Sequence, residues 1–425
     1  MTILGLSSSS TQLVSIRTFF VFTFCSLGLV ASGAFADAPW PCFLGPGGNP
    51  VVDTTLPTSF VPSTDEEEAG ENVAWRIPLA GRSVSGPIVV DGKVITTGSS
   101  GIEGRWMHVV AADAASGRVL WERTTRSTGR PFCHPDSANA APTPCTDGER
   151  VYAFYSSNDL VCYDLDGNLQ WFRSLTDSHP LAGNDVGMSA SPVVANGVVV
   201  VAVECQADSF AAGIDAKTGE VLWDISRPSS ANWSSPRIVS GEGKSGVALL
   251  QSGRKLAAVD LSSGQSMWEK DIQCSTVATA LVAEDSVFVP GRGVQALRLV
   301  SATQEPEVSW DSTQIRPNSS SLVKTSWGLI GLNRSILVCC DEQGEKLWNV
   351  RLKDAGTVWA TPVVAGDHLY LFAMNGRCFT VKLNADQAEV VAVSEMGEDV
   401  LGTPAVAEGA MYVRSVDALW KIAAE

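Results

Sequence analysis

One short pattern recurs along this 425-residue chain and constrains its fold more than any other feature. It consists of an Asp, a Gly three or four residues later and a Trp four residues after the Gly, as in Asp113-Ala-Ala-Ser-Gly117-Arg-Val-Leu-Trp121. The other copies place these residues at Asp164, Gly167 and Trp171; at Asp215, Gly219 and Trp223; at Asp260, Gly264 and Trp268; and at Asp341, Gly344 and Trp348. Internal repetition of this kind is the signature of an architecture built from copies of one supersecondary unit.

The chemistry of the pattern is structural. An Asp side chain accepts hydrogen bonds from backbone amides two residues ahead, and a Gly adopts the positive φ that a tight turn requires. The Trp then falls on the next strand, where its ring packs between neighbouring units; Trp75 and Trp310 continue the series without the full motif. The alternative is an array of rings that stacks on carbohydrate or nucleic acid. Repetition at one position of every unit favours packing.

A second signature precedes each motif by about 25 to 35 residues. It is a small residue, a Pro, an apolar run, a turn and a second apolar run, and the copies begin at Pro87, Pro144, Pro192, Pro236, Pro362 and Pro404. Divergent copies begin near Thr279 and Ser326. Pro suits the first residue of a strand because it has no N–H to donate, and a turn such as Asp91-Gly92 is a strong hairpin signal. Each unit is therefore predicted to contain four short strands.

Unit length and unit count predict the architecture. Successive Trp residues of the series are 38–52 residues apart, which matches a four-stranded propeller blade. Eight first strands predict eight blades, but the last unit, residues 403–423, has only three strands. The segment from Asn72 to Pro78, which contains Trp75, supplies the missing fourth strand, and such closure hides sheet edges. The sequence thus predicts an all-β, eight-bladed β-propeller of four-stranded blades over residues 72–425, closed by an N-terminal strand.

The N-terminus has the features of a targeting segment. Arg17 precedes an apolar run from Phe19 to Val30, and Ala34-Phe35-Ala36 offers a small-residue cleavage site. We predict a signal peptide over residues 1–36, cleaved after Ala36, and an N-terminal strap over residues 37–71; an uncleaved anchor is the alternative. No later apolar stretch is long enough to span a bilayer, so we expect a periplasmic or secreted protein without membrane insertion.

Charge and cysteine content limit the functional classes. The formal net charge is −16, which argues against nucleic acid and anionic membrane surfaces as partners, because both attract basic patches. Nine of the ten cysteines follow residue 36, too few for a disulfide scaffold and odd in number. Cys133 and Cys145 flank one exported loop, and either a disulfide between them or two free thiols is consistent with the sequence.

The repeats resemble those of the pyrroloquinoline-quinone (PQQ) repeat propellers, which include quinoprotein alcohol dehydrogenases and BamB-like outer-membrane assembly factors. The resemblance rests on the third-strand Asp, turn Gly and fourth-strand Trp, and it covers residues 72–423. The opening segment Trp40-Pro-Cys-Phe43-Leu-Gly45-Pro46 also looks like the strap before the first blade in many secreted bacterial members. The resemblance to this family implies an eight-bladed fold, with either an assembly role or a quinoprotein activity.

For the dehydrogenases, the resemblance implies PQQ over the central channel, usually with Ca²⁺, a catalytic Asp and often a disulfide between adjacent cysteines. Cys339-Cys340 is such a pair, but the position two before the motif Asp is small in every copy: Ala111, Cys162, Gly213, Ala258 and Cys339. Cys339 is therefore interpreted as a packing residue. The histidines, at 108, 134, 179 and 368, share no metal-ligand spacing, and we predict neither catalytic residues nor a metal site.

The candidate binding surface lies at one end of the channel. The long connection from Thr124 to Thr143 carries Arg130, Cys133, His134 and Asp136, and it joins a fourth strand to the next first strand. Long loops on rigid scaffolds often carry function. The other predicted members of this face each precede a first-strand Pro, namely Arg82, Met188, Trp233 and Trp359. The alternative is that the aromatic residues only cap the channel.

Two functions remain open. The first is an exported, monomeric, non-catalytic scaffold that binds a protein partner or a small ligand at the channel face and needs no cofactor. The second is a divergent PQQ-dependent oxidoreductase that binds PQQ with Ca²⁺.

Export with cleavage after Ala36 makes a direct prediction. The intact mass of the exported protein should correspond to a chain that begins at Asp37, because the apolar run and the Ala-Phe-Ala site precede that residue. A mass that includes Met1 would contradict the predicted cleavage.

Overall fold

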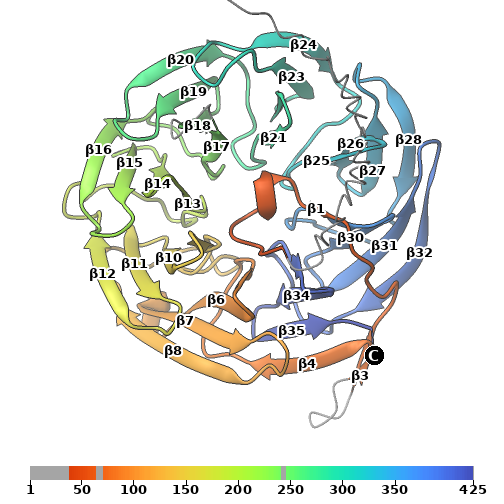
Figure 1. Cartoon of the computed structure of the whole chain (residues 1–425), viewed down its shortest axis with the longest axis horizontal. Coiled ribbons are helices and arrows are strands. Elements are labelled where there is room, and N and C mark those ends of the chain that lie inside the picture. The colour runs from red at the N-terminus through yellow and green to blue at the C-terminus, as the bar shows by residue number, and fades with distance from the viewer. Residues whose placement is uncertain (1–37, 64–69, 241–245, 425) are drawn as a thin grey trace, which may run out of the picture. The chain divides into compact units, whose positions relative to one another are not determined.

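Four-stranded antiparallel sheets follow one another around a central axis (Figure 1). This computed structural model describes residues 38–63, 70–240 and 246–424, so the predicted signal peptide lies outside the described residues. Eight such sheets are present, one of them extended by a fifth strand, and each runs from an inner first strand to an outer fourth strand. The predicted all-β, eight-bladed propeller is confirmed.

The first four blades follow the chain from residue 88 to residue 271. Blade 1 comprises β5 (Ile88–Val90), β6 (Lys93–Ser100), β7 (Trp106–Asp113) and β8 (Val119–Arg126). Blade 2 comprises β9 (Cys145–Thr146), β10 (Arg150–Phe154), β11 (Asp159–Asp164) and β12 (Leu169–Ser174). Blade 3 comprises β13 (Val193–Ala195), β14 (Val198–Val203), β15 (Phe210–Asp215) and β16 (Val221–Ser226). Blade 4 comprises β17 (Arg237–Ser240), β18 (Gly246–Ser252), β19 (Lys255–Asp260) and β20 (Ser266–Asp271).

The remaining blades complete the ring. Blade 5 comprises β21 (Leu281–Ala283), β22 (Ser286–Pro290), β23 (Val294–Arg298) and β24 (Glu307–Ser312). Blade 6 comprises β25 (Val323–Thr325), β26 (Gly328–Asn333), β27 (Ile336–Cys340) and β28 (Lys346–Arg351). Blade 7 comprises β29 (Val363–Ala365), β30 (His368–Phe372), β31 (Arg377–Leu383) and β32 (Ala388–Glu395). Blade 8 comprises β33 (Ala405–Ala407), β34 (Ala410–Arg414), β35 (Ala418–Ile422) and β4 (Val73–Pro78).

The predicted start of blade 6 is wrong by three residues. Its first strand begins at Val323, and Ser326 lies in the hairpin turn that follows. The reason is that Leu322 stands where six other blades have Pro, so the usual signal for the start of the strand is missing. In blade 5, Ala280 replaces the same Pro, and the first strand begins at Leu281, as expected from the copy near Thr279.

The repeated Trp residues pack against the next blade. A Cβ added to Gly117 would lie 2.8 Å from the ring of Trp75, and one added to Gly167 would lie 2.6 Å from Trp121. Both glycines have positive φ, 72° and 79°. The indole N–H of Trp121 also donates to a backbone carbonyl of the next turn, that of Leu165, at 2.9 Å. The turn position therefore requires glycine for two reasons: the backbone has a positive φ, and a side chain would collide with the indole ring.

The small third-strand residue has a matching role. Cys162 pairs with Trp171 across the sheet, Gly213 pairs with Trp223, and Cys339 pairs with Trp348. A Cβ on Gly213 would lie only 2.2 Å from the Trp223 ring, so a large side chain here would displace the indole. The packing interpretation of this position is confirmed.

The motif Asp closes the turn below the indole. Asp215 accepts hydrogen bonds from the backbone N–H groups of Thr218 and Lys217, at 2.7 and 3.0 Å. The Thr218 N–H is the main reason that the pKa of the Asp215 carboxyl lies below its usual value. A carboxyl whose pKa is lower in the folded than in the unfolded state stabilises the fold fully when the pH is above its unfolded-state pKa. This stabilisation is lost as the pH falls through the lowered, folded-state pKa.

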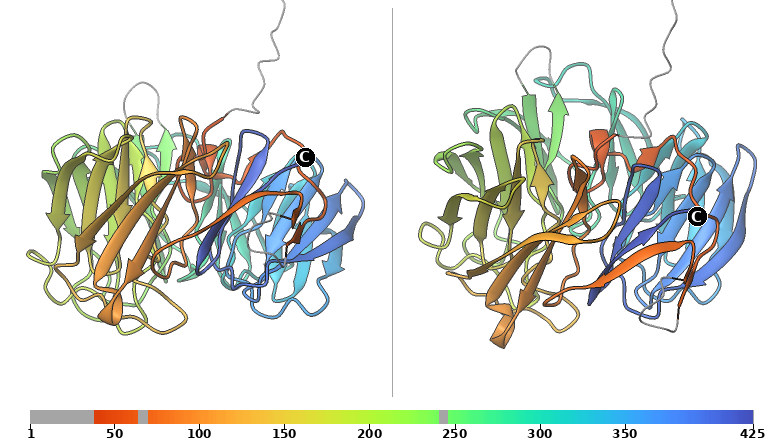
Figure 2. Two further views of the ribbon diagram at one scale, coloured as in Figure 1. Left: turned by 90° about the horizontal axis from the view of Figure 1, so that it is seen from below. Right: turned by 60° about the horizontal axis from the view of Figure 1, so that its bottom comes forward.

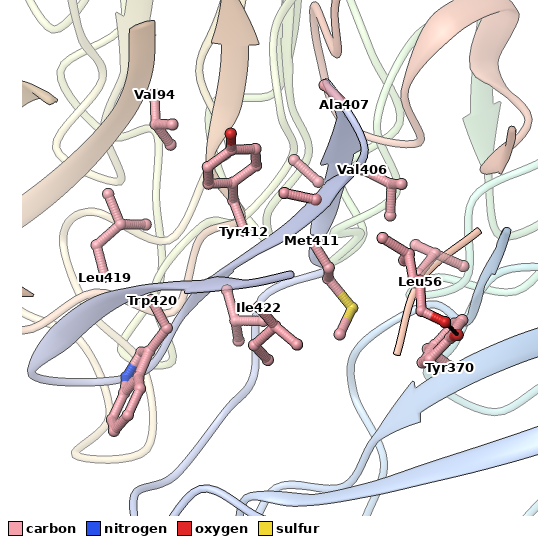
Figure 3. Close-up of a cluster of buried hydrophobic side chains, with 14 of the residues drawn as sticks. Leu56, Val94, Tyr370, Val406, Ala407, Met411, Tyr412, Leu419, Trp420 and Ile422 are labelled. Atoms are coloured by element: carbon pink, nitrogen blue, oxygen red, sulfur yellow. Dashed lines mark hydrogen bonds between the residues drawn. The ribbon is translucent and has the colours of Figure 1, made fainter. Parts of the chain in front are cut away.

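Blade 8 joins the two ends of the propeller. β4 pairs antiparallel with β35, and Lys421 lies opposite Trp75. The core beside this junction contains Tyr412, Leu419 and Ile422 from blade 8 together with Leu56 from the N-terminal segment (Figure 3). The hydroxyl of Tyr370 donates to the carbonyl of Leu56 at 3.1 Å. The predicted closure by an N-terminal strand is confirmed.

The chain before β4 crosses the ring before it joins blade 8. Trp40 exchanges backbone hydrogen bonds with Val89 of blade 1, and the 3₁₀ turn η2 (Pro46–Gly48) lies near the ring centre (Figure 1). β1 (Val51–Val52) then adds to β29 in parallel, and β2 (Val61–Pro62) pairs with β3 (Gly70–Glu71). Residues 38–52, called the N-terminal plug below, therefore span the channel from blade 1 to blade 7.

The strands run between two opposite faces of the ring, where their connections gather (Figure 2). Antiparallel pairing puts the turns after first and third strands on one face. The connections after second and fourth strands lie on the other, called the loop face below. The only helical elements of the described ranges are η2 and a second 3₁₀ turn, η3 (Ile102–Gly104), so nothing described there has the length and hydropathy of a membrane-spanning helix.

Ring closure through Trp75 can be tested by substitution. Trp75→Ala should lower the free energy of unfolding by about 3–5 kcal/mol, because the indole is buried on the seam between blades 8 and 1. Trp106→Ala is the matched control, since that ring is 43% exposed, and should cost less than about 1 kcal/mol. Equal changes in denaturant unfolding for the two variants would show that the seam does not depend on this ring.

Candidate functional site

The centre of the ring holds a cavity of about 450 Å³ that opens on the loop face. Every connection from a fourth strand to the next first strand contributes to its wall, from Val84 before blade 1 to Leu401 before blade 8. Phe43 of the N-terminal plug also lines it. Ligand sites commonly occupy about 300–1,000 Å³, so the cavity is large enough for a small molecule.

A belt of hydroxyl groups surrounds the axis at the base of this cavity. It is formed by the residue that precedes the first-strand Pro position in seven blades: Thr143, Ser191, Ser235, Thr279, Ser321, Thr361 and Thr403. The backbone N–H of each residue donates to the hydroxyl of the next, as from Ser191 to Ser235 at 2.9 Å and from Ser235 to Thr279 at 3.0 Å. This hydroxyl belt links neighbouring blades at the axis.

The belt has one gap, at Gly86 of blade 1. The Gly86 N–H donates to Thr143 at 2.9 Å, but Gly86 offers no hydroxyl to Thr403. A Cβ on Gly86 would lie 2.3 Å from the carbonyl oxygen of Thr403, so a side chain is excluded there. The gap falls between blades 8 and 1, the position at which the two ends of the propeller meet.

Two of the predicted surface residues, Trp233 and Trp359, lie in the cavity wall. The indole N–H of Trp233 donates to the carbonyl of Gly187 at 2.7 Å, which fixes the ring against the neighbouring connection. Trp359 comes from the connection between blades 6 and 7 and is 44% exposed. The cavity thus has one fixed and one exposed indole.

A buried ion pair holds the connection that carries Trp233. Arg227 Nε donates to Glu204 Oε1 at 2.8 Å, and the Ser252 hydroxyl donates to the same oxygen at 2.6 Å. Asn232 donates through its side-chain amide to the Gln251 carbonyl at 2.7 Å. Burial raises the pKa of the Glu204 carboxyl, and Arg227 opposes this shift. These residues lie beneath the connection and position Trp233, a role that sequence reasoning missed.

Two long connections pack together beside the cavity. The His134 N–H donates to the Val186 carbonyl at 3.2 Å, and Arg130 forms an ion pair with Asp185 at 2.5 Å. A third loop joins them, because the side-chain amide of Asn139 donates to the carbonyl of Gly104 at 3.1 Å. Residues 101–105, 127–143 and 175–187 therefore form one raised surface, called the loop wall below.

The remaining predicted residues occupy different places. His134 lines the cavity, with a largely exposed side chain. Arg82 does not line it; its Nε donates to the Ser137 carbonyl at 3.1 Å and so supports the loop wall. Met188 is 1% exposed and packs in the core between blades 2 and 3, so the prediction that its side chain lies on the binding surface is wrong. Its neighbours Gly187 and Ser189 line the cavity instead.

The adjacent pair Cys339-Cys340 lies inside blade 6. Both residues are on β27, and their side chains belong to two different core clusters. Burial raises the pKa of the Cys339 thiol to about 12 and that of the Cys340 thiol to about 11. Neither thiol lines the cavity. The pair therefore has a packing role, as the sequence alignment indicated.

The cysteines of the described ranges are free thiols, including Cys133 and Cys145. A disulfide between these two, one of the alternatives from the sequence, is therefore not present in the structure. Cys145 is buried in the core between blades 2 and 3, whereas Cys133 is half-buried in the loop wall. In the same ranges, no group of three or more His, Cys, Asp or Glu residues is arranged to hold a metal ion.

Comparison with known proteins identifies the family. A family model described as outer membrane protein assembly factor BamB matches residues 66–206, 182–325 and 333–425. The chain belongs to this family. BamB of Moranella endobia is 21% identical over 258 residues, 51% of this chain and 62% of that protein. BamB of Bordetella pertussis is 28% identical over 177 residues, 41% of this chain and 38% of that protein. The matches span less than two thirds of either relative.

Solved structures share the propeller fold. BamB from Moraxella catarrhalis is 13% identical, with a TM-score of 0.59 over 82% of this chain and 96% of that chain. Quinohemoprotein alcohol dehydrogenase from Comamonas testosteroni is 12% identical, with a TM-score of 0.67 over 93% of this chain and 82% of that chain. At these identities the likeness shows the fold alone.

The hydroxyl belt predicts a specific stability pattern. Ser235→Ala should destabilise the BamB-family chain by about 1–3 kcal/mol, because the buried N–H of Ser191 loses its acceptor. Ser189→Ala is the control: Ser189 also lines the cavity, but no hydrogen bond to its hydroxyl is found within the described ranges. Its effect should stay within about 0.5 kcal/mol in denaturant unfolding. Similar losses in the free energy of unfolding for both variants would contradict the role of the belt in linking blades.

Proposed function

We propose that this BamB-family protein is an exported, non-catalytic scaffold that binds a protein partner through the loop wall. The observation that carries the proposal is the set of exposed apolar side chains on these three loops. Ile102 is 72% exposed and Leu181 is 70% exposed, and Phe132 and Val186 are exposed beside them. Exposed apolar residues gathered on one surface are typical of protein interaction sites.

The loop wall is also well ordered for binding. The Arg130 guanidinium lies over the Phe132 ring at 5.4 Å from its centroid and also pairs with Asp185. His179 stacks on Phe210 at 3.9 Å and contacts Asp224 at 2.6 Å, which fixes the start of the 175–187 loop. A surface that is ordered before binding loses less conformational entropy when a partner docks.

The residues around the cavity support a non-catalytic role over PQQ chemistry. PQQ is a tricarboxylate, and its Ca²⁺ partner prefers carboxylate and amide oxygens. Among the described residues, no Lys or Arg lines the cavity, and Asp136 is its only carboxylate. Asp136 is also largely exposed. This lining does not suit PQQ with Ca²⁺, so we propose no cofactor and no oxidoreductase step.

Export is part of the same proposal. The signal peptide predicted over residues 1–36 supports it, as do the family and relatives, whose names refer to outer membrane protein assembly. We infer a monomer whose partner is a protein of that assembly process. The acidic net charge of −16 supports a protein partner over nucleic acid.

Site-specific photo-crosslinking in the native host tests this function. A crosslinking residue at position 181 should yield a discrete adduct that contains a component of the outer-membrane assembly machinery, identified by mass spectrometry. Position 169 is the matched control, because Leu169 is 58% exposed but lies on β12 at the outer rim of blade 2.

The two positions should also differ on substitution. Leu181→Asp should abolish co-purification of the same component, whereas Leu169→Asp should not. Identical adducts at both positions, or none at position 181, would refute docking at the loop wall.

A further inference from the structure

The hydroxyl belt retains unused hydrogen-bonding capacity. A Ser or Thr hydroxyl has one O–H donor and two acceptor lone pairs. Each belt hydroxyl accepts one backbone N–H, but within the described ranges no acceptor receives its own O–H. Five belt residues line the cavity and are more than nine-tenths buried: Thr143, Ser191, Ser235, Thr279 and Thr403. The base of the cavity thus presents these five hydroxyls as a partial ring, and their O–H groups have no acceptor among the described residues.

The wall above this ring has a different chemistry. Trp233 and Trp359 present indole surfaces, and Val277 and Leu401 add aliphatic groups to the same wall. The N-terminal plug supplies Phe43 below, and Arg237 holds the Phe43 carbonyl at 3.3 Å. A ligand here meets apolar surfaces at its sides and hydroxyl groups at its end.

The charge of the lining selects against ionic ligands. Among the described residues, His134 and Asp136 are the only titratable ones in the lining, and both side chains are largely exposed. An anionic ligand would find no Lys or Arg side chain in the described part of this lining, and a cation would find one carboxylate, that of the exposed Asp136. Burial of an unpaired charge is costly, so the cavity favours a neutral ligand.

We infer that the central cavity binds a neutral saccharide, as a free sugar or as the terminal unit of a longer neutral glycan. The pyranose ring has an apolar C–H face that packs on indole, and hydroxyl and ring oxygens that accept hydrogen bonds from the belt. This ligand matches both halves of the cavity. The inference goes beyond protein docking at the loop wall and does not depend on it.

Calorimetric titration of the mature protein tests the inference. The probes are free neutral monosaccharides, neutral oligosaccharides, their uronic acid and phosphorylated counterparts, and PQQ with Ca²⁺. A neutral sugar should bind, with heat that saturates, and the charged probes should bind at least about tenfold more weakly. Binding of oligosaccharides alone would identify a glycan terminus as the ligand. Lack of binding by every neutral probe, or equal or tighter binding of the charged probes, would overturn the inference.

Matched variants locate the site. Trp359→Ala should weaken binding about tenfold or more, whereas Trp106→Ala, which removes a similarly exposed indole outside the cavity, should leave it unchanged. Equal affinities for these two variants would overturn the assignment.

A belt residue provides a second test. Thr279→Val should abolish binding and Thr279→Ser should retain it, with thermal unfolding as the check that both variants fold. Retained binding in folded Thr279→Val would show that the belt does not contact the ligand. Leu181→Asp should bind sugar normally, so failure of the docking proposal and failure of this one give different results.

Discussion

The contact between each indole and the next turn determines how the whole propeller is built. Four short strands bury too little surface to be stable alone, so a blade depends on its neighbours. Trp171 illustrates how they are joined: its ring covers Gly219 and its N–H donates to the Ala216 carbonyl at 3.1 Å. One side chain thus fixes both the distance and the angle between two blades. A fourth-strand Trp recurs in seven of the eight blades, and only β32 of blade 7 has none.

The hydroxyl belt links the same blades around the axis, at the start of their first strands. Ser or Thr at this position accepts the backbone N–H of the preceding blade, as Thr361 does from Ser321 at 3.1 Å. The indoles at the rim and the hydroxyls at the axis therefore hold each sheet at two radii. The loop-face connections begin and end on these fixed strands, which gives the cavity and the loop wall a rigid base.

The sequence predicted the fold well because its signals are local and repeated. The motif Asp, Gly and Trp lie within nine residues. The turn that Asp and Gly form is local, and the Trp packs on the next copy of the same turn, so one repeated pattern predicts both. The candidate site was predicted only in part. Trp233 and Trp359 line the cavity, but the Met188 side chain is buried in the core between blades 2 and 3. Phe43 reaches the cavity through a plug that crosses the ring. The sequence indicated a strap here, but it did not indicate this long-range contact.

The belt shows how a structural requirement also generates a binding surface. Its signal was visible in the sequence as a small residue before Pro, but only the ring geometry shows that the hydroxyls meet around one axis. Each hydroxyl has more hydrogen-bonding capacity than the link between blades uses: Thr279, for example, accepts the Ser235 N–H, and within the described ranges no acceptor receives its own O–H. Buried donors without partners are costly, so water or a ligand must satisfy them. A ligand with oxygen atoms at one end satisfies several donors at once, which favours it over separate water molecules.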